Sequence, residues 1–597
     1  MSFLQNLFPS FDRVVRVRRC CGSVLVGVLL VTPCAYAEPS PPVASPDTPP
    51  QVVFEVILGE IALKRDKPQV ALAAYADLAL KYNDPDIFRR TLELAAINRR
   101  PELMLETARL WAEREPESAD ALNALSGMQI MVGRYADAEP VLIRYLALLP
   151  PDQRNKVLLQ LPQRFPPQAD PKLSLALVEA VTAPYLSLSS AQLARAQMAL
   201  RAGDATGSLA AVRQVRRADT DSESAVLLEA QILSRQSPEA VLAILAEFLA
   251  SHPNAATIRA LYAQQLLSMG RLPEARAQVV QLLAMGTVAP EPLFAAAAVA
   301  VQAQAPDLAI QALNRLLTVE TIDTALIQYN LGLAYEAQAD LDRARSGEGA
   351  VASMAEAEAI MHYQQVGRGD YFVPSRLRAA SLMARRGNLD GARTLLQGTS
   401  VTDAAARTEL RIGEATLLSE YGDKKAALQL LERAVSKDPK NVILRYELGM
   451  MAERLGRMDL FERSMRTVIQ QDPKYAQAYN ALGFTLVDRN ERLKEARRLI
   501  EKALTLAPND PFILDSMGWL TYREQQFDVA LDYLNRAAAL RADPEIVAHQ
   551  VAVLQAMGRH GDAMAVWQAG TQRFPDNAAL KALGDTLKPT GVVPQDL

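Results

Sequence analysis

Apolar residues recur at helical spacing from about Val52 almost to the end of the 597-residue chain. The pattern is clearest over residues 475–543, where two antiparallel helical segments are followed by a second copy of themselves. Small residues stand at corresponding places in both copies, Gly483 matching Gly518 and Ala503 matching Ala537. Strand-like runs of Val, Ile and Thr are scarce. The pattern therefore predicts an all-α chain of repeated helical hairpins.

Three sets of residues define the repeat. Prolines at the end of the second helix lie 34, 34 and 35 residues apart in the pairs Pro116/Pro150, Pro439/Pro473 and Pro473/Pro508. Glycines between the two helices, each followed five residues later by alanine, predict a positive φ at the turn: Gly133, Gly270, Gly387, Gly422 and Gly558. Glycines inside the first helix each cost about 1 kcal/mol relative to alanine, which predicts a close helix–helix approach that offsets this cost: Gly332, Gly449, Gly483 and Gly518.

About fifteen units fit these spacings. The first three occupy residues 52–83, 85–116 and 119–150, and the fourth, 152–186, is degenerate because Pro162, Pro166 and Pro167 interrupt its helices. Later units begin near residues 189, 222, 256, 290, 325, 373, 408, 442, 476, 511 and 544. We therefore expect a partly degenerate array over 51–370, a regular array over 371–577 and a tail over 578–597.

The unit near residue 325 carries an insertion. Residues 330–335 open its first helix, residues 342–344 are expected to begin the second, and residues 359–366 complete it. The intervening segment, about 345–358, is small and acidic. Both a surface excursion and a partner-specific loop fit this composition.

The N-terminal sequence predicts export. Four arginines precede an apolar run at residues 20–31, and Ala35-Tyr36-Ala37 supplies a small-x-small cleavage pattern, so residues 1–37 read as a signal peptide cleaved after Ala37. The run is shorter than the roughly 20 residues that a membrane span needs. The alternative is a lipoprotein with Cys34 lipidated, although Pro33 stands where a lipobox carries Gly, Ala or Ser.

The residues after the leader fit the same compartment. Six prolines in residues 38–50 predict an extended tether. Cys20, Cys21 and Cys34 are the three cysteines of the chain, so the mature domain carries no thiol, as suits an oxidising compartment. We therefore expect a periplasmic protein, either soluble or attached to the outer membrane. The formal net charge of −4 argues against nucleic acid as a partner.

These repeat motifs resemble the tetratricopeptide family over almost the whole mature chain. The resemblance implies a right-handed superhelix, an α-solenoid whose first helices line a concave groove for peptides or partner proteins. Residues 479–489 and 513–523 resemble the carboxy-terminal repeats of long proteobacterial envelope proteins of this family. One such group consists of lipoprotein adaptors that bind a periplasmic carboxy-terminal processing protease and present substrates to it.

Candidate chemistry is sparse. The four histidines have no metal-ligand spacing, and no phosphate-cradling glycine loop or Gly-x-Ser-x-Gly motif occurs. The sequence therefore predicts no metal site, no cofactor and no enzymatic activity. The leading hypothesis is a protein-binding adaptor for a periplasmic protease and its substrates; the alternative is an assembly or secretion factor for outer-membrane proteins or exported polysaccharide.

The family resemblance also selects groove residues. The first-helix positions that face inward in the family are Tyr446, Arg454, Asn480, Phe484, Asp488, Asp515, Trp519, Tyr522 and Arg523. Aromatic residues beside Arg and Asp are enriched at recognition surfaces. Phe484 and Trp519 fit an inter-repeat core equally well. Asn480 resembles the asparagines of peptide-carboxylate clamps in this family, but the companion lysines are missing, so a carboxylate clamp is not predicted.

Overall fold

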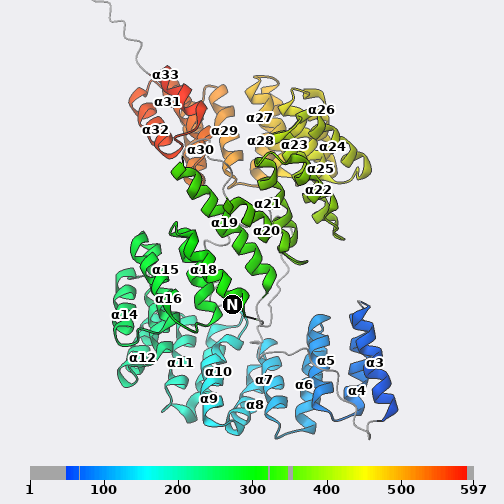
Figure 1. Ribbon diagram of the computed structural model, residues 1–597, viewed down its shortest axis with the longest axis vertical. Coiled ribbons are helices and arrows are strands. Elements are labelled where there is room, and N and C mark those ends of the chain that lie inside the picture. The colour runs from blue at the N-terminus through cyan, green and yellow to red at the C-terminus, as the bar shows by residue number, and fades with distance from the viewer. Residues whose placement is uncertain (1–48, 66, 235, 320–322, 347–353, 588–597) are drawn as a thin grey trace, which may run out of the picture. The chain divides into compact units, whose positions relative to one another are not determined.

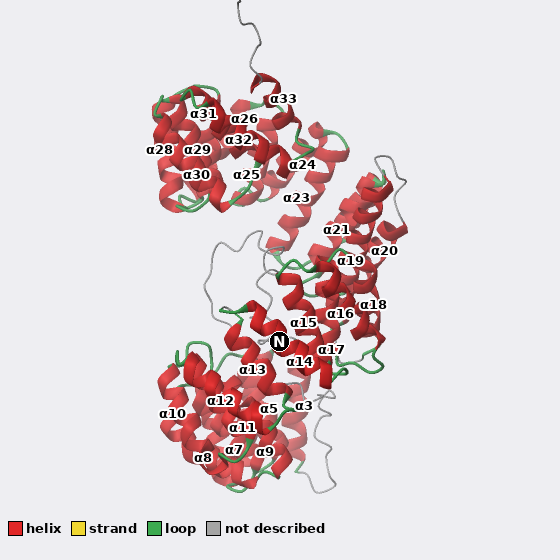
Figure 2. Cartoon of the chain, turned by 90° about the vertical axis from the view of Figure 1, so that its left-hand side faces the viewer, coloured by secondary structure: helices red, strands yellow, loops and turns green. Residues whose placement is uncertain are grey.

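The computed structural model describes residues 49–587 except 66, 235, 320–322 and 347–353. Over these residues the chain forms thirty-one α-helices and two short 3₁₀-helices, without a strand (Figures 1 and 2). The all-α prediction is confirmed. The expected signal peptide, Ala37, Cys34 and residues 38–48 of the tether lie outside the described residues.

The chain divides into two compact units, residues 1–322 and 323–597. The α-helices of the first unit are α3 (Pro50–Lys64), α4 (Pro68–Lys81), α5 (Pro85–Ile97), α6 (Pro101–Arg114), α7 (Ala119–Met131), α8 (Tyr135–Leu148), α9 (Pro151–Gln160), α10 (Pro171–Thr182), α11 (Ser189–Arg201), α12 (Ala205–Ala218), α13 (Glu223–Leu233), α14 (Pro238–Ser251), α15 (Ala256–Ser268), α16 (Leu272–Ala284), α17 (Pro290–Gln302) and α18 (Pro306–Leu317). Except at α9 and α10, successive helices pack as hairpins that stack on the next hairpin.

The fourth hairpin departs from this packing, as its prolines predict. Helix α9 ends at Gln160 and passes into a 3₁₀-helix, η1 (Leu161–Arg164), which contains Pro162, and η2 (Ala183–Tyr185) follows α10. Helix α9 then packs against α11 and α10 against α8. The unit still buries Leu158, Leu161 and Phe165, so it continues the core of its neighbours despite its irregular backbone.

The second unit contains α19 (Thr324–Ser346), α20 (Met354–Gln365), α21 (Phe372–Arg385), α22 (Leu389–Gly398), α23 (Ala404–Tyr421), α24 (Lys424–Lys437), α25 (Val442–Arg454), α26 (Met458–Gln471), α27 (Ala476–Asp488), α28 (Leu493–Leu506), α29 (Pro511–Arg523), α30 (Phe527–Leu540), α31 (Pro544–Ala556), α32 (His560–Arg573) and α33 (Ala578–Leu587). Each odd-numbered helix from α19 to α31 is the first helix of a hairpin. It packs on its own second helix, and α21, α23, α27 and α29 also pack on the first helix of the following repeat.

The turn between the helices depends on a left-handed residue. At Gly558 φ is +73°, and the amide of Arg559 donates to the Leu554 carbonyl at 2.9 Å, which closes the end of α31. Arg99, Gln304, Asn490 and Gln525 adopt positive φ at the corresponding turns without being glycine. The prediction is wrong at Gly422, which ends α23 with a φ of −138° and donates its amide to the Leu418 carbonyl.

The glycines inside the first helices mark close approaches, as predicted. A Cβ atom added to Gly483 would lie 2.6 Å from Cγ1 of Ile500 and 3.3 Å from the Ala496 carbonyl oxygen. At Gly518 it would lie 2.7 Å from Cγ of Leu534. In both hairpins the second helix occupies the space that a side chain would need, so a larger residue would push the helices apart.

Three boundaries differ from the sequence expectation. Pro50 starts α3 instead of ending the tether, because proline suits the first helical turn. Asp342 to Ala344 do not begin a second helix: α19 continues through them, since no helix breaker stands between Gly332 and Gly347, and α20 begins within the expected insertion. Residues 578–587 are not a tail but form α33, which packs on α31 and α32.

Helix α33 has a clear physical cause. The last hairpin would otherwise leave the apolar side of α31 and α32 in water, which terminal repeats must avoid. Leu583 and Leu587 pack against this surface, and Nε1 of Trp567 donates to the Leu580 carbonyl at 2.7 Å. The end of the repeat array is therefore covered by its own chain.

Candidate functional site

An open pocket of about 250 Å³ lies where four consecutive first helices of the second unit meet. It is lined by Tyr446 and Met450 from α25, by Gln477, Asn480, Ala481 and Phe484 from α27, by Asp510, Phe512, Ile513, Asp515 and Ser516 at α29, and by Glu545 from α31. Its lining is divided between apolar or aromatic side chains and polar ones, and concave sites that combine the two commonly bind ligands. We refer to it as the α25–α31 pocket.

The helical repeat explains why these side chains share one surface. The four lining residues of α27 stand at positions i, i+3, i+4 and i+7, which form one face of a helix. Ala478, Leu482 and Leu486 lie on the opposite face and are buried in the hairpin core. The start of α29 is fixed by Asp510, whose Oδ1 accepts hydrogen bonds from the amides of Phe512 at 2.9 Å and Ile513 at 3.2 Å.

The pocket combines acidic side chains with apolar walls. Its lining residues include the carboxylates of Asp510, Asp515 and Glu545 but no lysine, arginine or histidine. Burial raises the pKa of Glu545 above its ordinary value, and the charges of Asp515, Asp543 and Asp488 raise it further, while His549 lowers it. Burial is therefore the main cause of the raised pKa of Glu545, and the neighbouring carboxylates add to it.

One polar group of the pocket is unsatisfied. Oδ1 of Asn480 is buried and has no hydrogen-bond partner among the described residues. Buried polar atoms are normally hydrogen-bonded, and each exception needs an explanation. Among the described residues, the fold itself therefore supplies no donor to this oxygen.

A second group of aromatic side chains comes from α29 and α31, two of the four helices that line the pocket. Nδ1 of His549 is 2.8 Å from Oδ1 of Asp515, and both side chains are buried. The Trp519 ring stacks on His549 with centroids 4.2 Å apart and on Tyr522 with centroids 4.7 Å apart. The guanidinium of Arg523 lies 5.1 Å from the centroid of Trp519. This stack connects α29 to α31.

The structure separates the nine predicted groove residues into three groups. Tyr446, Asn480, Phe484 and Asp515 line the α25–α31 pocket. Trp519, Tyr522 and Arg523 form the aromatic stack and do not line it, so their contacts fit the inter-repeat alternative for Trp519. Arg454 and Asp488 are exposed at the ends of α25 and α27 and do not line it either.

Sequence reasoning missed Asp510, Phe512 and Glu545. All three stand at the start of a first helix, whereas the prediction considered positions further along it. A signal was present in the sequence: Asp510-Pro511 and Asp543-Pro544 are both Asp-Pro pairs, with the aspartate at the N-cap and the proline at the first helical position. Side chains in the first turn after such a pair reach the mouth of the pocket.

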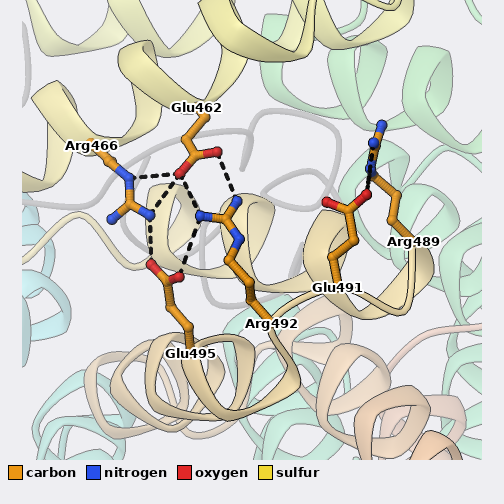
Figure 3. A network of polar contacts seen from close by, with 6 residues as sticks. All are labelled: Glu462, Arg466, Arg489, Glu491, Arg492 and Glu495. Atoms are coloured by element: carbon orange, nitrogen blue, oxygen red, sulfur yellow. Dashed lines mark hydrogen bonds and ion pairs between the residues drawn. The ribbon is translucent and has the colours of Figure 1, made fainter.

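The second helices are connected by a separate charged network, shown in Figure 3. Glu462 and Arg466 on α26 contact Arg492 and Glu495 at the start of α28, with Arg492 Nη2 2.8 Å from Glu462 Oε2. Arg489 pairs with Glu491 beside it. Hydrogen bonds from Arg492 and then Arg466 lower the pKa of Glu462 to about 2. This network holds two successive hairpins together.

Comparison with known proteins supports the repeat assignment. Two family models described as tetratricopeptide repeat match residues 412–476 and 476–510. The TPR repeat-containing protein PA4667 of Pseudomonas aeruginosa is 29% identical over 502 residues, which cover 83% of this chain and 81% of that protein. The anaphase-promoting complex subunit 7 of Dictyostelium discoideum is 26% identical over 159 residues, 27% of each chain.

Solved structures give weaker matches. The yeast Tom70 structure covers 73% of this chain and 96% of its own, with a TM-score of 0.37 and 12% identity. The tetratricopeptide protein TTC0263 of Thermus thermophilus covers 30% of this chain and 96% of its own, with a TM-score of 0.28 and 22% identity.

Of the described helices, none is long and apolar enough to cross a membrane. The family matches identify residues 412–510 of this chain as tetratricopeptide repeats, a fold that serves as a protein-interaction scaffold.

Proposed function

We propose that this protein is a binding scaffold of the cell envelope that holds partner polypeptides in the α25–α31 pocket, acting as an adaptor between a periplasmic processing protease and its substrates. The observation that carries the binding role is the pocket itself. It combines apolar walls with the unsatisfied amide of Asn480, and four successive first helices contribute to it. Stacked repeats present such extended surfaces to partners.

The envelope location and the protease partner rest on the sequence. The basic and apolar leader, the Ala35-Tyr36-Ala37 pattern and the proline-rich segment support export. The resemblance of residues 479–489 and 513–523 to the envelope adaptors supports the protease partner. The same residues 479–489 supply Asn480, Ala481 and Phe484 to the pocket, so the resemblance covers part of the candidate binding surface.

Affinity capture from envelope extracts tests this function. The full chain is compared with Gln477→Trp, which places a bulky ring at an exposed residue of the pocket lining, and with Gln568→Trp, which changes an exposed residue of α32 outside it. We expect the wild type and Gln568→Trp to capture a carboxy-terminal processing protease together with its substrates. We expect Gln477→Trp to lose the captured substrates.

Two results would contradict the proposal. An identical set of captured proteins for all three chains would remove the pocket from binding. Capture of outer-membrane proteins or polysaccharide-export proteins without a protease would favour the assembly or secretion role instead.

A further inference from the structure

The charge of the α25–α31 pocket restricts what can occupy it. Oδ1 of Asp510 is used by two backbone amides, and Oδ1 of Asp515 is used by His549. Among the described residues, no hydrogen-bond donor reaches the second oxygen of either aspartate or the carboxylate of Glu545. Three carboxylates therefore keep acceptor capacity beside one apolar cavity.

Cations of this chain lie near the pocket but do not line it. His549 contacts Asp515, and the guanidinium of Arg541 lies 4.9 Å from the centroid of the Phe512 ring. Arg541 also approaches Asp543, with its Nε 3.9 Å from Oδ2. The charge of Arg541 is therefore partly balanced by Asp543, which does not line the pocket. The position of Arg541 also shows that the Phe512 ring accepts a cation.

The walls suit a long basic side chain. Tyr446, Met450, Phe484 and Ile513 supply apolar surface along which the methylene groups of such a side chain would pack. The charged end would then reach the carboxylates of the lining. An acidic side chain would face three like charges at the same place.

A metal ion is a poorer fit. In the part of the chain that the structure describes, no three His, Cys, Asp or Glu side chains converge as metal ligands do. The pocket lining instead combines three carboxylates with apolar side chains. A single charged group on an apolar stem matches this arrangement better than a bare ion.

We infer that the α25–α31 pocket binds a lysine or arginine side chain of the captured polypeptide, so that the scaffold selects segments in which a basic residue lies among apolar ones. This inference rests on the proposed function, because it specifies the ligand of the same pocket. Asp510, Asp515 and Glu545 supply the charge, and the aromatic and aliphatic walls supply the contact area.

Selection from a random dodecapeptide mixture tests the inference. The peptides are N-acetylated and C-amidated, so that side chains carry all of their positive charge, and retained peptides are identified by mass spectrometry. The full chain is compared with Glu545→Gln, with the pocket-blocked Gln477→Trp and with Glu291→Gln. Glu291 is a matched control, because it is exposed and follows the first proline of α17 as Glu545 follows that of α31.

We expect the wild type and Glu291→Gln to retain peptides enriched in lysine or arginine relative to the starting mixture. Glu545→Gln should reduce this enrichment, and Gln477→Trp should abolish retention. In a selected peptide, replacing the basic residue with glutamine should weaken binding roughly 10- to 150-fold, because charge-assisted hydrogen bonds contribute roughly 1.5–3 kcal/mol.

Failure of the inference can be distinguished from failure of the proposed function. Peptides that depend on the pocket but show no excess of basic residues would overturn the inference and leave the proposed function intact. A basic excess that is unchanged in both Glu545→Gln and Gln477→Trp would also overturn it, since the attraction would then come from the acidic surface elsewhere. No retention by the wild type above Gln477→Trp would contradict the inference and peptide binding together.

Discussion

Nδ1 of His549 lies 2.8 Å from Oδ1 of Asp515, a residue 34 positions earlier in the chain and therefore one repeat away. Both side chains are buried, and Asp515 also lines the α25–α31 pocket. The pair joins the first helices of two successive hairpins directly behind the candidate binding surface. The position of Asp515 in the pocket wall therefore depends on the folding of the next repeat, which supplies His549.

The first prediction concerns this pair. Asp515→Ala and His549→Ala should each destabilise the second unit by about 1–3 kcal/mol, because each leaves a buried polar partner unsatisfied. The double variant should be less destabilised than the sum of the two, with a coupling of about 0.5–3 kcal/mol. Urea denaturation measures all three. Additive effects would mean that the contact does not stabilise the fold, and His560→Ala, at an exposed histidine, is the control.

The second prediction concerns helix approach. Gly483→Leu should cost about 1–3 kcal/mol by overpacking, since its first side-chain atom would meet Ile500. Gly561→Ala, at a helical glycine with nothing within 4 Å of the added atom, should instead stabilise by up to about 1 kcal/mol. Thermal melts of the two variants should shift in opposite directions. Equal melting of Gly483→Leu and the wild type would contradict the packing.

The fold was largely predictable because glycine, alanine and proline recur along the sequence at the spacing of the repeat. The expected unit starts at residues 119, 189, 256 and 290 coincide with the starts of α7, α11, α15 and α17. Errors occurred where local signals were absent. Nothing inside residues 333–346 breaks the helix, so the end of α19 was misplaced. Helix α33 packs on the apolar surface of the neighbouring hairpin, a contact that its own sequence does not reveal.

The candidate site was predictable only in part. The family resemblance selected Tyr446, Asn480, Phe484 and Asp515, and these four residues line the pocket. Glu545 and Phe512 were not predicted. They line the pocket because of where α31 and α29 begin relative to the preceding first helices, and this tertiary relationship cannot be read from the sequence. The stacking of Trp519 on His549 is tertiary as well, and it withdraws Trp519 from the lining of the pocket.

The third prediction concerns the network of Figure 3. The pKa of Glu462 is lowered from 4.5 to about 2 in the folded chain, so its contribution to stability is present above about pH 4.5 and is lost as the pH falls toward 2. Glu462→Gln should cost about 1 kcal/mol at neutral pH and almost nothing at pH 2. Denaturation midpoints across this range measure the difference. Glu432→Gln, at an exposed residue of α24, should show no such trend.

The fourth prediction has the opposite sign. The pKa of Glu545 is raised by burial and by neighbouring carboxylates, so its charged form opposes folding at neutral pH. Glu545→Gln should therefore stabilise the free protein only slightly at pH 7, because the exposed side chain is screened by solvent, and this gain should disappear as the pH falls below the ordinary glutamate value. Urea denaturation at pH 7 and pH 4 measures both. A gain that persists at the lower pH would contradict the electrostatic origin.

The central claim is that partner polypeptides occupy the α25–α31 pocket, and site-specific photo-crosslinking tests it most directly. Benzoylphenylalanine is placed at Phe512, which lines the pocket and is 43% exposed, and at Tyr421, which lies at the end of α23 and is 41% exposed. In envelope extracts we expect protein crosslinks from position 512 that disappear when Gln477→Trp is added, and few from position 421. Crosslinks from position 512 that are no more abundant than those from 421, or that are unaffected by Gln477→Trp, would contradict the account.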